Sequence, residues 1–581
     1  MGKTVRAIVQ NLSPYTWEPS SASIAAKLGL KEKDIIRFDT NTSSYNPPLG
    51  PLRKVKISEY PDASYQALAR LLAKYSGVKE KQIVVGAGAD EIIDVITRTF
   101  LEQGEKAVIS SPTYSLFQIS VELAGGVAVE VPREKDYELN AERIMSKARE
   151  TDAKLIFICN PNNPTGNLTQ AKDLIKIAKT VDSILVVDEA YYEFCGKSVV
   201  NSLRKQDNAI IIRTLSKGFG LAGIRVGYAI VPTRLADMMN RCRPPNSVSA
   251  ISLKIAENAL KNDTGDMGRK ISCMQMERRR LIRELERIGL YVYPSVANFV
   301  LIRTSERLAN RVCEGLLRKG IVIRNLSDNE LTKGCLRITV RSRGENSSLL
   351  YELRKILSSR YDVVIFDVDG VIFDVSDSYR EVIRKTASFF LGREVGMDEV
   401  ERVKSIVGFN NDWDATFAIV TSAQDPTKID KQSDLYGKVK SYFQSIYLGS
   451  QEQPGLISNE KQLISKGTLA KLRGNGLKLG IVTSRPRSEA LIALGALVGT
   501  YFQKSNVIAL EDCIEEKPSS KPLRILIRRM GCKRPIYVGD NPSDVVAANS
   551  AQIPIAVVGE KARGDFYLRD VNDIYEMVVG K

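Results

Sequence analysis

The chain has 581 residues, more than the ~250–300 that a single hydrophobic core supports, so two or three domains are expected. Its hydrophobic content of 43% and charged content of 26% are those of ordinary globular proteins, and no apolar run approaches the ~18 residues of a membrane span. The basic residues behind the net charge of +16 are spread out and interleaved with acidic ones, which favours phosphorylated small-molecule substrates over nucleic acid.

Strand-like and helix-like segments alternate between about residues 80 and 230. The predicted strands are QIVVG, KAVISS, VAVEV, KLIFICN, ILVVDEA and AIIIRTL, with amphipathic helices such as DLIKIAKTV between them. This alternation predicts an α/β domain whose mostly parallel sheet is covered by helices on both faces. Residues 1–45 are expected to form an extended arm, and residues 245–357 a smaller α+β part that ends in a helix.

A second domain is predicted to begin after a very short junction at 358–360, which divides the chain into domains 1–357 and 361–581. The hydrophobic run Val363–Phe366 leads directly into Asp367-Val368-Asp369-Gly370. This pattern predicts a buried strand that delivers two carboxylates to a loop. The long stretch between Asp374 and Thr483 is predominantly helical in pattern.

In the first domain, three polar residues follow predicted strands: Asn163 in CNPNNPTGN, Asp188 in LVVDEAYYEF and Lys217 in TLSKGFG. Ligands of open α/β sheets bind at the carboxyl ends of strands, so these residues are expected to meet in one site. Because the chain contains no histidine, histidine bases, histidine-ligated metals and Ser-His-Asp triads are excluded. Catalysis is left to lysine, aspartate, tyrosine or arginine.

These segments make residues 1–357 resemble the fold-type I pyridoxal-phosphate aminotransferases and, among them, the histidinol-phosphate aminotransferases. The matching segments are SPYTW, RFDTNTSSYNPP, YPDAS, GAGADE, SPTYS, NPNNPTG, VVDEAYYEF, RTLSKGFGLAGIRVGY, ANFVL and GCLRITV. The resemblance implies a pyridoxal 5'-phosphate cofactor and a large mixed-sheet α/β domain with a small α+β domain. It also implies a homodimer whose subunits share their active sites.

The resemblance assigns the catalytic role to Lys217, which would form the Schiff base with the cofactor and then move the substrate's proton. Asp188 would pair with the ring nitrogen and keep it protonated. Asn163 and Tyr191 would hydrogen-bond the phenolate oxygen of the ring, and Tyr114 would stack on its face.

The cofactor phosphate is expected at the amino end of the helix that opens with Ala89 and Asp90, where free N–H groups and the helix dipole favour an anion. Three further residues would complete this phosphate site: Thr214, Ser216 and Arg225. Tyr60, in the YPD motif, matches the residue that reaches the cofactor phosphate of the neighbouring subunit.

For the substrate, Arg324 and Arg337 match the arginines that bind an anionic group, either the phosphate of histidinol phosphate or the carboxylate of glutamate. Tyr15 and Asn41 lie in segments that line the substrate pocket in the family. The sequence departs from the family at Thr42, where a glutamate is usual, so the contacts to the imidazole side of the substrate differ.

Four motifs in order make residues 361–581 resemble the haloacid dehalogenase superfamily of phosphotransferases: DVDGV, LGIVTSR, EEKPSSKPL and PIYVGDNPSD. The resemblance implies a Rossmann-like α/β domain with a helical cap at about 376–475. Asp367 would attack phosphorus, and Asp369 would protonate the leaving alcohol and then activate water. The second aspartate favours a phosphatase, because the dehalogenase members lack it.

The same resemblance places Mg²⁺ in the second domain. Its candidate ligands are the carboxylates of Asp367, Asp369, Asp540 and Asp544. Thr483 would hydrogen-bond the phosphoryl oxygens of the substrate, and Lys517 would offset the charge between nucleophile and phosphate.

The two resemblances together imply consecutive steps of histidine biosynthesis. The first domain would convert imidazole acetol phosphate and glutamate to histidinol phosphate, and the second would hydrolyse that product to histidinol. Other hypotheses stay open. The first domain could be an aromatic aminotransferase or a threonine-phosphate decarboxylase, and the second a phosphatase of other specificity or a non-catalytic regulatory module.

Eight scattered cysteines without a CxxC pair are expected to be reduced thiols, which fits a reducing compartment. The N-terminal stretch lacks the apolar core of a signal peptide. A cytoplasmic location is therefore expected, with small phosphorylated substrates and glutamate as ligands and neither membrane nor nucleic acid as a partner.

Overall fold

The computed structural model describes residues 9, 12, 18–50, 52, 55–357, 361–407, 409, 411–450 and 453–579. Packing divides the chain into two compact units. The first comprises residues 1–283, 292–302 and 309–352, and the second comprises residues 353–581 with 284–291 and 303–308. Within the described ranges, no helix combines the length and the apolar content that crossing a bilayer requires.

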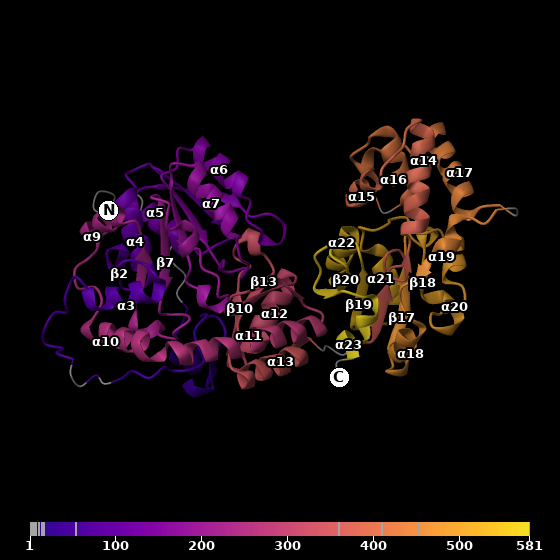
Figure 1. Cartoon of the computed structure of the whole chain (residues 1–581). Helices are drawn as coiled ribbons and strands as arrows, with labels where there is room; N and C mark the ends of the chain where they lie inside the picture. Colours follow the sequence, from indigo (N-terminus) through magenta and orange to yellow (C-terminus); the bar gives the residue numbers. More distant parts are fainter. Residues whose placement is uncertain are drawn as a thin grey trace, which may run out of the picture. The chain divides into compact units, whose positions relative to one another are not determined.

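The first unit is built on a seven-stranded sheet with the order β2-β8-β7-β6-β5-β3-β4 (Figure 1). The strands are β2 (Ile83–Gly86), β3 (Lys106–Ser111), β4 (Val127–Pro132), β5 (Leu155–Cys159), β6 (Ile184–Asp188), β7 (Ala209–Thr214) and β8 (Gly227–Ile230). β8 runs antiparallel to β2 and β7, and the other pairs are parallel. The predicted α/β class with a mixed sheet is confirmed.

Helices cover both faces of this sheet. One face carries α4 (Ala89–Phe100), α5 (Leu116–Ala124) and α9 (Thr233–Cys242), and the other carries α3 (Gln66–Ser76), α6 (Ala141–Glu150) and α7 (Ala171–Thr180). A strand that is covered on both faces must be apolar along its whole length. In β5 all five residues, LIFIC, are accordingly buried.

A smaller four-stranded sheet has the order β12-β13-β10-β9. Its strands are β9 (Tyr291–Val292), β10 (Phe299–Arg303), β12 (Arg324–Asn325) and β13 (Cys335–Thr339), and the helices of this region are α11 (Thr264–Arg287), α12 (Glu306–Leu317) and α13 (Arg343–Leu357). The predicted N-terminal arm contains α2 (Ser21–Leu28) and β1 (Ile36–Arg37), and β1 pairs in parallel with β11 (Ile321–Val322). Helix α10 (Ala250–Asn258) buries its apolar side in the core of the large sheet, so the smaller part begins after 245.

The second unit contains a six-stranded parallel sheet with the order β18-β17-β14-β19-β20-β21. Its strands are β14 (Val363–Phe366), β17 (Lys478–Val482), β18 (Val507–Ile508), β19 (Pro535–Gly539), β20 (Ile555–Val558) and β21 (Phe566–Leu568). Helices α21 (Lys521–Met530) and α22 (Pro542–Ala551) bury apolar residues against one face of the sheet. All four residues of β14 are buried, which confirms the predicted strand before Asp367.

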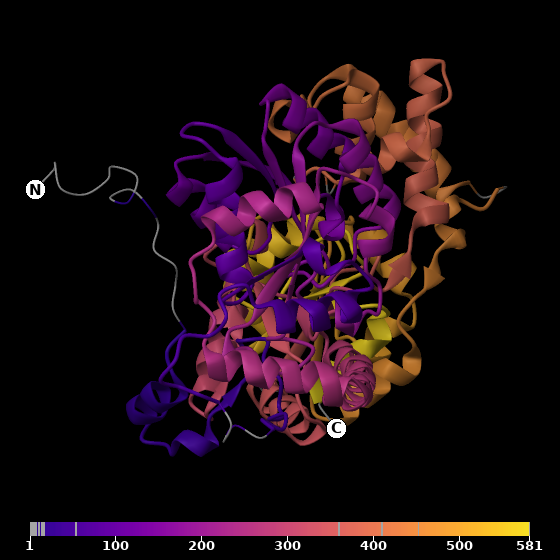
Figure 2. The ribbon, with the colours of Figure 1, turned by 60° about the vertical axis from the view of Figure 1, so that its left-hand side comes forward.

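Between β14 and β17 the chain forms a helical cap, seen from two sides in Figures 1 and 2. The cap helices are α14 (Glu381–Leu391), α15 (Met397–Lys404), α16 (Asp412–Thr421) and α17 (Asp434–Leu448). The segments that enter and leave it pair as antiparallel strands, β15 (Phe373–Asp374) and β16 (Lys461–Gln462). The next helix, α18 (Lys466–Gly474), contacts β17 and α23 (Ile574–Val579) of the core, so the inserted helices end before residue 475.

Candidate active sites

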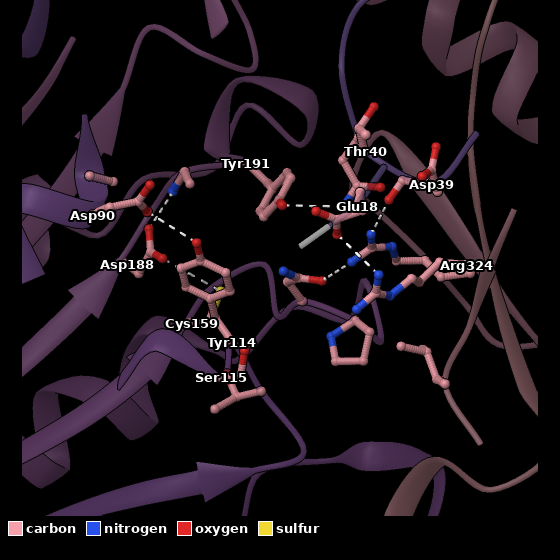
Figure 3. Close-up of a pocket in the computed structure, with 18 of the residues that line it drawn as sticks. Glu18, Asp39, Thr40, Asp90, Tyr114, Ser115, Cys159, Asp188, Tyr191 and Arg324 are labelled. Atoms are coloured by element: carbon pink, nitrogen blue, oxygen red, sulfur yellow. Dashed lines mark hydrogen bonds and ion pairs between the residues drawn. The ribbon is translucent and has the colours of Figure 1, made fainter. Parts of the chain in front are cut away.

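A cavity of about 620 Å³ lies in the first unit at the carboxyl ends of β5, β6 and β7 (Figure 3). These ends present Cys159, Asp188 and Thr214, and the loop after β7 adds Lys217. Parallel strands end at the same edge of a sheet, so residues distant in sequence meet there. The predicted meeting of Asn163, Asp188 and Lys217 in one cavity is therefore observed.

Asp188 is the last residue of β6, and its carboxyl group is buried. One oxygen accepts the backbone N–H of Ala190 at 2.9 Å, and the other lies 4.0 Å from the thiol of Cys159. Burial raises the pKa of Asp188 to about 7. A positively charged group placed beside it would therefore hold it as a carboxylate.

Lys217 brings its amine into the same cavity. The Nζ atom donates to the carbonyl of Thr40 at 3.3 Å and lies 5.7 Å from the ring centre of Tyr191. Burial, helped by the positive charge of Arg337, lowers the pKa of Lys217 to about 8. An amine with such a pKa is partly neutral near physiological pH and can act as a nucleophile.

A polar network around Tyr191 and Asn163 also lines the cavity. The hydroxyl of Tyr191 accepts from the side-chain amide of Asn41 at 3.3 Å. The side-chain oxygen of Asn163 accepts from Arg337 at 2.7 Å. Burial raises the pKa of Tyr191, so its hydroxyl stays protonated and can donate a hydrogen bond.

The predicted phosphate site lies at the start of α4. Gly88 precedes the helix with φ +88°, and a side chain there would meet the Arg225 guanidinium at 2.7 Å, so only glycine fits. Asp90 accepts from the hydroxyl of Tyr114 at 3.0 Å and from Arg225 at 2.9 Å. The predicted residues around this helix end all line the cavity: Ala89, Asp90, Tyr114, Thr214, Ser216 and Arg225.

The two predicted substrate arginines also reach this cavity. Figure 3 shows Arg324 facing Glu18, and their nearest nitrogen and oxygen atoms are 3.1 Å apart. Arg337 is buried and bonds Asn163 and the carbonyl of Asp39. The sequence interpretation missed Glu18, because this glutamate lies in a segment without any periodic pattern.

Tyr15 and Tyr60 were also predicted for this site. Tyr15 lies outside the described residues. The side chain of Tyr60 is 89% exposed and does not line the cavity, so its predicted contact with a neighbouring subunit stays a prediction.

The donors and acceptors of this cavity fit pyridoxal phosphate. Lys217 provides a partly buried amine that donates to a carbonyl oxygen, and Asp188 provides a buried carboxyl group for a ring nitrogen. The start of α4 with Ser216 and Arg225 suits a phosphate. A cavity of about 620 Å³ has room for the cofactor and a small substrate.

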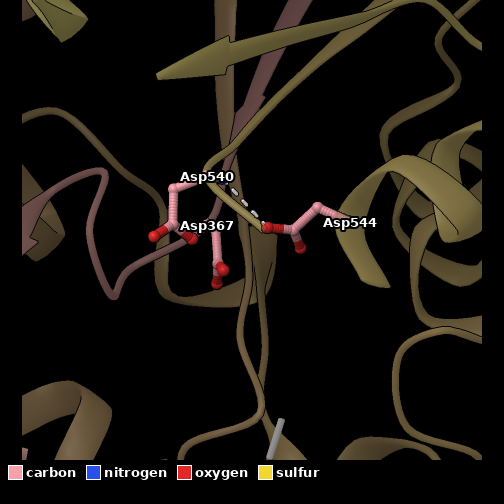
Figure 4. A group of neighbouring side chains, drawn as sticks. All are labelled: Asp367, Asp540 and Asp544. Atoms are coloured by element: carbon pink, nitrogen blue, oxygen red, sulfur yellow. Dashed lines mark hydrogen bonds between the residues drawn. The ribbon is translucent and has the colours of Figure 1, made fainter. Parts of the chain in front are cut away.

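The second site lies at the carboxyl ends of β14 and β19, where Asp367 and Asp540 follow their strands. The carboxylates of Asp367, Asp540 and Asp544 offer oxygen atoms that lie within 4.8 Å of one another (Figure 4). Gly370 has φ +71°, and a Cβ atom there would come within 2.3 Å of an Asp540 oxygen. This glycine therefore permits the close approach of the two loops.

Lys517 forms ion pairs with two of these carboxylates. Its Nζ atom lies 2.7 Å from Asp367 and 2.8 Å from Asp544, and the hydroxyl of Tyr537 donates to Asp544 at 2.8 Å. Burial raises the pKa of Asp367 well above its usual value, although Lys517 opposes the shift. Burial and Asp544 raise the pKa of Asp540 to about 6. A cluster of this charge and these oxygen ligands fits a divalent cation such as Mg²⁺.

The remaining predicted residues of this site are Thr483 and Asp369. The Thr483 hydroxyl accepts the backbone N–H of Arg485 at 3.1 Å. The adjacent Ser484 lines a cavity beside the carboxylates. Asp369 turns its carboxylate to Arg485, at 2.7 Å from the guanidinium Nε, and lies outside the group of Asp367, Asp540 and Asp544.

A cavity of about 280 Å³ adjoins this cluster and is closed partly by the cap. The cap contributes Glu401, Lys404, Ser405 and Asp412, and the core contributes Lys561. Lys404 pairs with Asp412 at 2.8 Å, and Glu401 lies 3.6 Å from Lys561. Glu401, Lys404 and Ser405 were not predicted, because only the folded cap brings them to the same cavity as Asp367.

Comparison with known proteins finds a family for each of the two parts of the chain. The sequence profile described as "Aminotransferase class I and II" matches residues 51–356, and the one described as "Haloacid dehalogenase-like hydrolase" matches residues 364–558. The histidinol-phosphate aminotransferase of Thermoanaerobacter pseudethanolicus is 36% identical over 329 residues, which are 55% of this chain and 93% of that protein. That of Caldanaerobacter subterraneus subsp. tengcongensis is 38% identical over 330 residues, with coverages of 55% and 93%.

Among solved structures, the histidinol-phosphate aminotransferase of Sinorhizobium meliloti in complex with pyridoxal-5'-phosphate is similar, with a TM-score of 0.56 and 27% identity. The similarity covers 61% of this chain and 97% of that one. Both resemblances inferred from the motifs are thereby confirmed. The chain belongs to the class I and II aminotransferases, and it carries a haloacid dehalogenase-like hydrolase domain after the aminotransferase part.

Proposed function

We propose that the chain is a bifunctional enzyme of histidine biosynthesis that carries out two consecutive steps. The first is transamination of imidazole acetol phosphate with glutamate to histidinol phosphate, and the second is hydrolysis of histidinol phosphate to histidinol. The observation that carries the proposal is the presence of two reactive sets in one chain, Lys217 with Asp188 and Asp367 with Lys517. The relatives named histidinol-phosphate aminotransferase support the first step, and the hydrolase domain supports cleavage of a phosphate ester.

In the first site, bound pyridoxal phosphate supplies an electron sink that weakens the bond to the substrate's α-hydrogen. Asp188, whose buried carboxyl group lines the cavity, would pair with the ring nitrogen and keep it protonated. Lys217, whose pKa of about 8 lies near neutral pH, takes and returns the substrate proton at its Nζ atom. Arg324 and Arg337 bind the anionic end of the substrate, and that anion takes the place of Glu18 at Arg324.

In the second site, Asp367 attacks phosphorus, the bond from phosphorus to the alcohol oxygen breaks, and that oxygen takes a proton from Asp369. The alcohol leaves, and the phosphoryl group stays on Asp367 as an acyl phosphate. Water then attacks phosphorus, gives a proton to Asp369 and releases phosphate from Asp367. Lys517 offsets the negative charge, and Asp367, Asp540 and Asp544 are the residues that would hold Mg²⁺, which screens the phosphoryl oxygens.

The assembly is part of the proposal. Ile57 is 78% exposed and Tyr60 is 89% exposed, although both are large side chains in one short segment. Exposed apolar side chains that lie together favour an interface. We place this segment at the contact of a homodimer in the cytoplasm, where Tyr60 would complete the phosphate site of the other subunit.

Two separate assays test the proposal on the purified full chain with pyridoxal phosphate and Mg²⁺. Lys217→Ala is expected to abolish the glutamate-dependent formation of histidinol phosphate and to leave phosphate release from added histidinol phosphate intact. Asp367→Asn is expected to do the reverse. The matched controls are Lys254→Ala and Asp425→Asn, at positions that line neither cavity.

The outcomes separate the hypotheses that the sequence left open. Aromatic amino acids and phosphothreonine stay open as alternative substrates, because enzymes that act on them share the cofactor motifs of this chain. Amino transfer from aromatic amino acids alone, or decarboxylation of phosphothreonine, would contradict the first step. Failure of the wild type to release phosphate from histidinol phosphate would contradict the second step.

A further inference from the structure

Arg485 is a buried arginine that follows the motif residue Thr483 by two positions. Its Nε atom donates to the Oδ1 oxygen of Asp369 at 2.7 Å, and its Nη2 atom donates to the same oxygen. The guanidinium thus binds only one of the two carboxylate oxygens. No hydrogen bond to the Oδ2 oxygen of Asp369 is found among the described residues, and the Asp369 side chain remains 31% exposed.

The other side of the Arg485 guanidinium is fixed as well. Its Nη1 atom donates to Glu460 at 3.0 Å and to the hydroxyl of Tyr447 at 3.1 Å. The ring centre of Tyr379 lies 4.7 Å from the guanidinium carbon. Tyr447 belongs to cap helix α17, Tyr379 lies where the cap begins, and Glu460 lies where the chain returns to the core.

This arrangement leaves Arg485 little freedom. Burial alone would lower the pKa of the guanidinium, but Asp369 and the neighbouring tyrosines and Glu460 hold it well above the usual value. A planar guanidinium that is bonded on two edges and stacked on a ring cannot rotate without breaking several contacts. The Oδ1 oxygen of Asp369 is therefore held in one place.

Asp369 lines the main cavity beside Asp367, and it also lines a small side cavity with Ser484, Trp413 and Asn411. Its Oδ2 oxygen is the one that remains available to a reacting group. The oxygen that leaves in a phosphate ester must sit between the phosphorus at Asp367 and a proton donor. The position of Asp369 at both cavities fits that donor.

We propose that Arg485 is a positioning residue for the phosphatase reaction, which holds the Asp369 carboxyl group so that its free oxygen meets the leaving oxygen of the ester. The inference rests on the proposed function of the second unit. In the first half-reaction the proton moves from Asp369 to the alcohol oxygen as its bond to phosphorus breaks, and in the second a water proton moves to Asp369. Arg485 contacts neither substrate nor metal ligand in this scheme and acts through Asp369.

Two phosphate esters with different leaving groups test this role. Histidinol phosphate releases an alkoxide oxygen that needs a proton, whereas 4-nitrophenyl phosphate releases a phenolate that leaves without one. The ratio kcat/KM covers only the steps up to release of the alcohol. General acid catalysis contributes about 10²–10⁴ in rate. Arg485→Gln and Arg485→Lys are therefore expected to lower kcat/KM for histidinol phosphate by at least about 100-fold and for the nitrophenyl ester by less than about 10-fold.

Three further variants calibrate the result. Asp369→Asn is expected to show the same discrimination between the esters, and combining it with Arg485→Gln is expected to add little, because both changes remove one function. Arg487→Gln is the matched control. Arg487 also forms an ion pair, with Asp512, but it lines neither cavity of this unit. Circular dichroism of each variant reports whether the second unit is folded.

Equal losses for both esters in folded Arg485 variants would overturn the positioning role, and so would unchanged activity. If both Arg485 variants fail to fold while Asp369→Asn folds, the arginine is structural and the role is also refuted. A wild type that releases phosphate from neither ester would instead refute the proposed phosphatase function, and the role of Arg485 with it.

Discussion

The ammonium group of Lys517 lies 2.7 Å from a carboxylate oxygen of Asp367, and both side chains are buried. Burial raises the pKa of Asp367 well above its usual value, which favours the protonated form, and a protonated carboxyl group is a poor nucleophile. Lys517 is the largest influence in the opposite direction. Lys517 therefore favours the ionised, nucleophilic form of Asp367, and it also stabilises the negative charge of the phosphate.

Replacing Lys517 with methionine is expected to reduce phosphate release by at least about 100-fold, the scale of losing one buried charge donor at a reacting centre. Lys521→Met is the matched control, because Lys521 is exposed and pairs with Glu515 away from the cavity. Initial rates of phosphate release measure both variants. A Lys517→Met rate close to that of the wild type would show that Asp367 does not need this partner.

Asp188 makes the stability of the first unit depend on pH when the cofactor is removed. Its pKa is about 7 in the folded chain and 3.8 in its ordinary state. Between these values the unfolded carboxyl group ionises while the folded one stays protonated, so stability falls as the pH rises through this window. The Asp188→Asn variant lacks this ionisation. We therefore expect its free energy of unfolding minus that of the wild type to increase by up to about 4 kcal/mol between pH 4 and pH 8.

Hydrogen exchange of peptides from β5, β6 and β7, compared at each pH between the cofactor-free wild type and Asp188→Asn, reports this difference. The comparison within one pH cancels the intrinsic exchange rates, and the change of the difference between pH 4 and pH 8 excludes any loss that is independent of pH. A difference in protection that stays constant from pH 4 to pH 8 would contradict the buried, protonated state of Asp188.

Lys217 is expected to react as an amine with a lowered pKa. Because its pKa is about 8, its labelling by an acylating reagent in the cofactor-free chain is expected to rise about tenfold per pH unit below pH 8 and to level off above it. Exposed lysines such as Lys319 serve as the internal reference. Mass spectrometry of the labelled peptides gives both curves, and coinciding curves for Lys217 and the reference would disprove the shift.

The group of Asp367, Asp540 and Asp544 is expected to bind one divalent cation. Titration calorimetry with Mg²⁺ is expected to give a binding signal for the wild type and none for Asp540→Asn, because each carboxylate supplies a ligand oxygen. Asp425→Asn, a change in an exposed residue of the cap, is the control and keeps the signal. Removal of the metal with a chelator is expected to stop phosphate release without affecting amino transfer.

Residues at strand ends were predictable because a long apolar run marks the strand and the polar residue after it marks the edge of the sheet. Asp188 after ILVV and Asp367 after VVIF are such cases, and both strands are buried as expected. Strand β8 was not predicted, because its four residues, GYAI, are too short to give a pattern of their own.

Arg485 and Glu18 could not be predicted in the same way. The partners of Arg485 are Asp369, Tyr447 and Glu460, and only the folded path of the cap brings them to one point. Glu18 reaches Arg324 across more than three hundred residues of sequence from a segment without periodicity. Local patterns describe strands and helices, whereas such contacts depend on how the loops between them are arranged.

The most direct test of two linked chemistries in one chain is phosphorus NMR of the full chain with imidazole acetol phosphate, glutamate, pyridoxal phosphate and Mg²⁺. We expect histidinol phosphate to form first and then to give way to inorganic phosphate, whereas the reaction of Asp367→Asn stops at histidinol phosphate. Accumulation of histidinol phosphate by the wild type, without conversion to inorganic phosphate, would contradict the account.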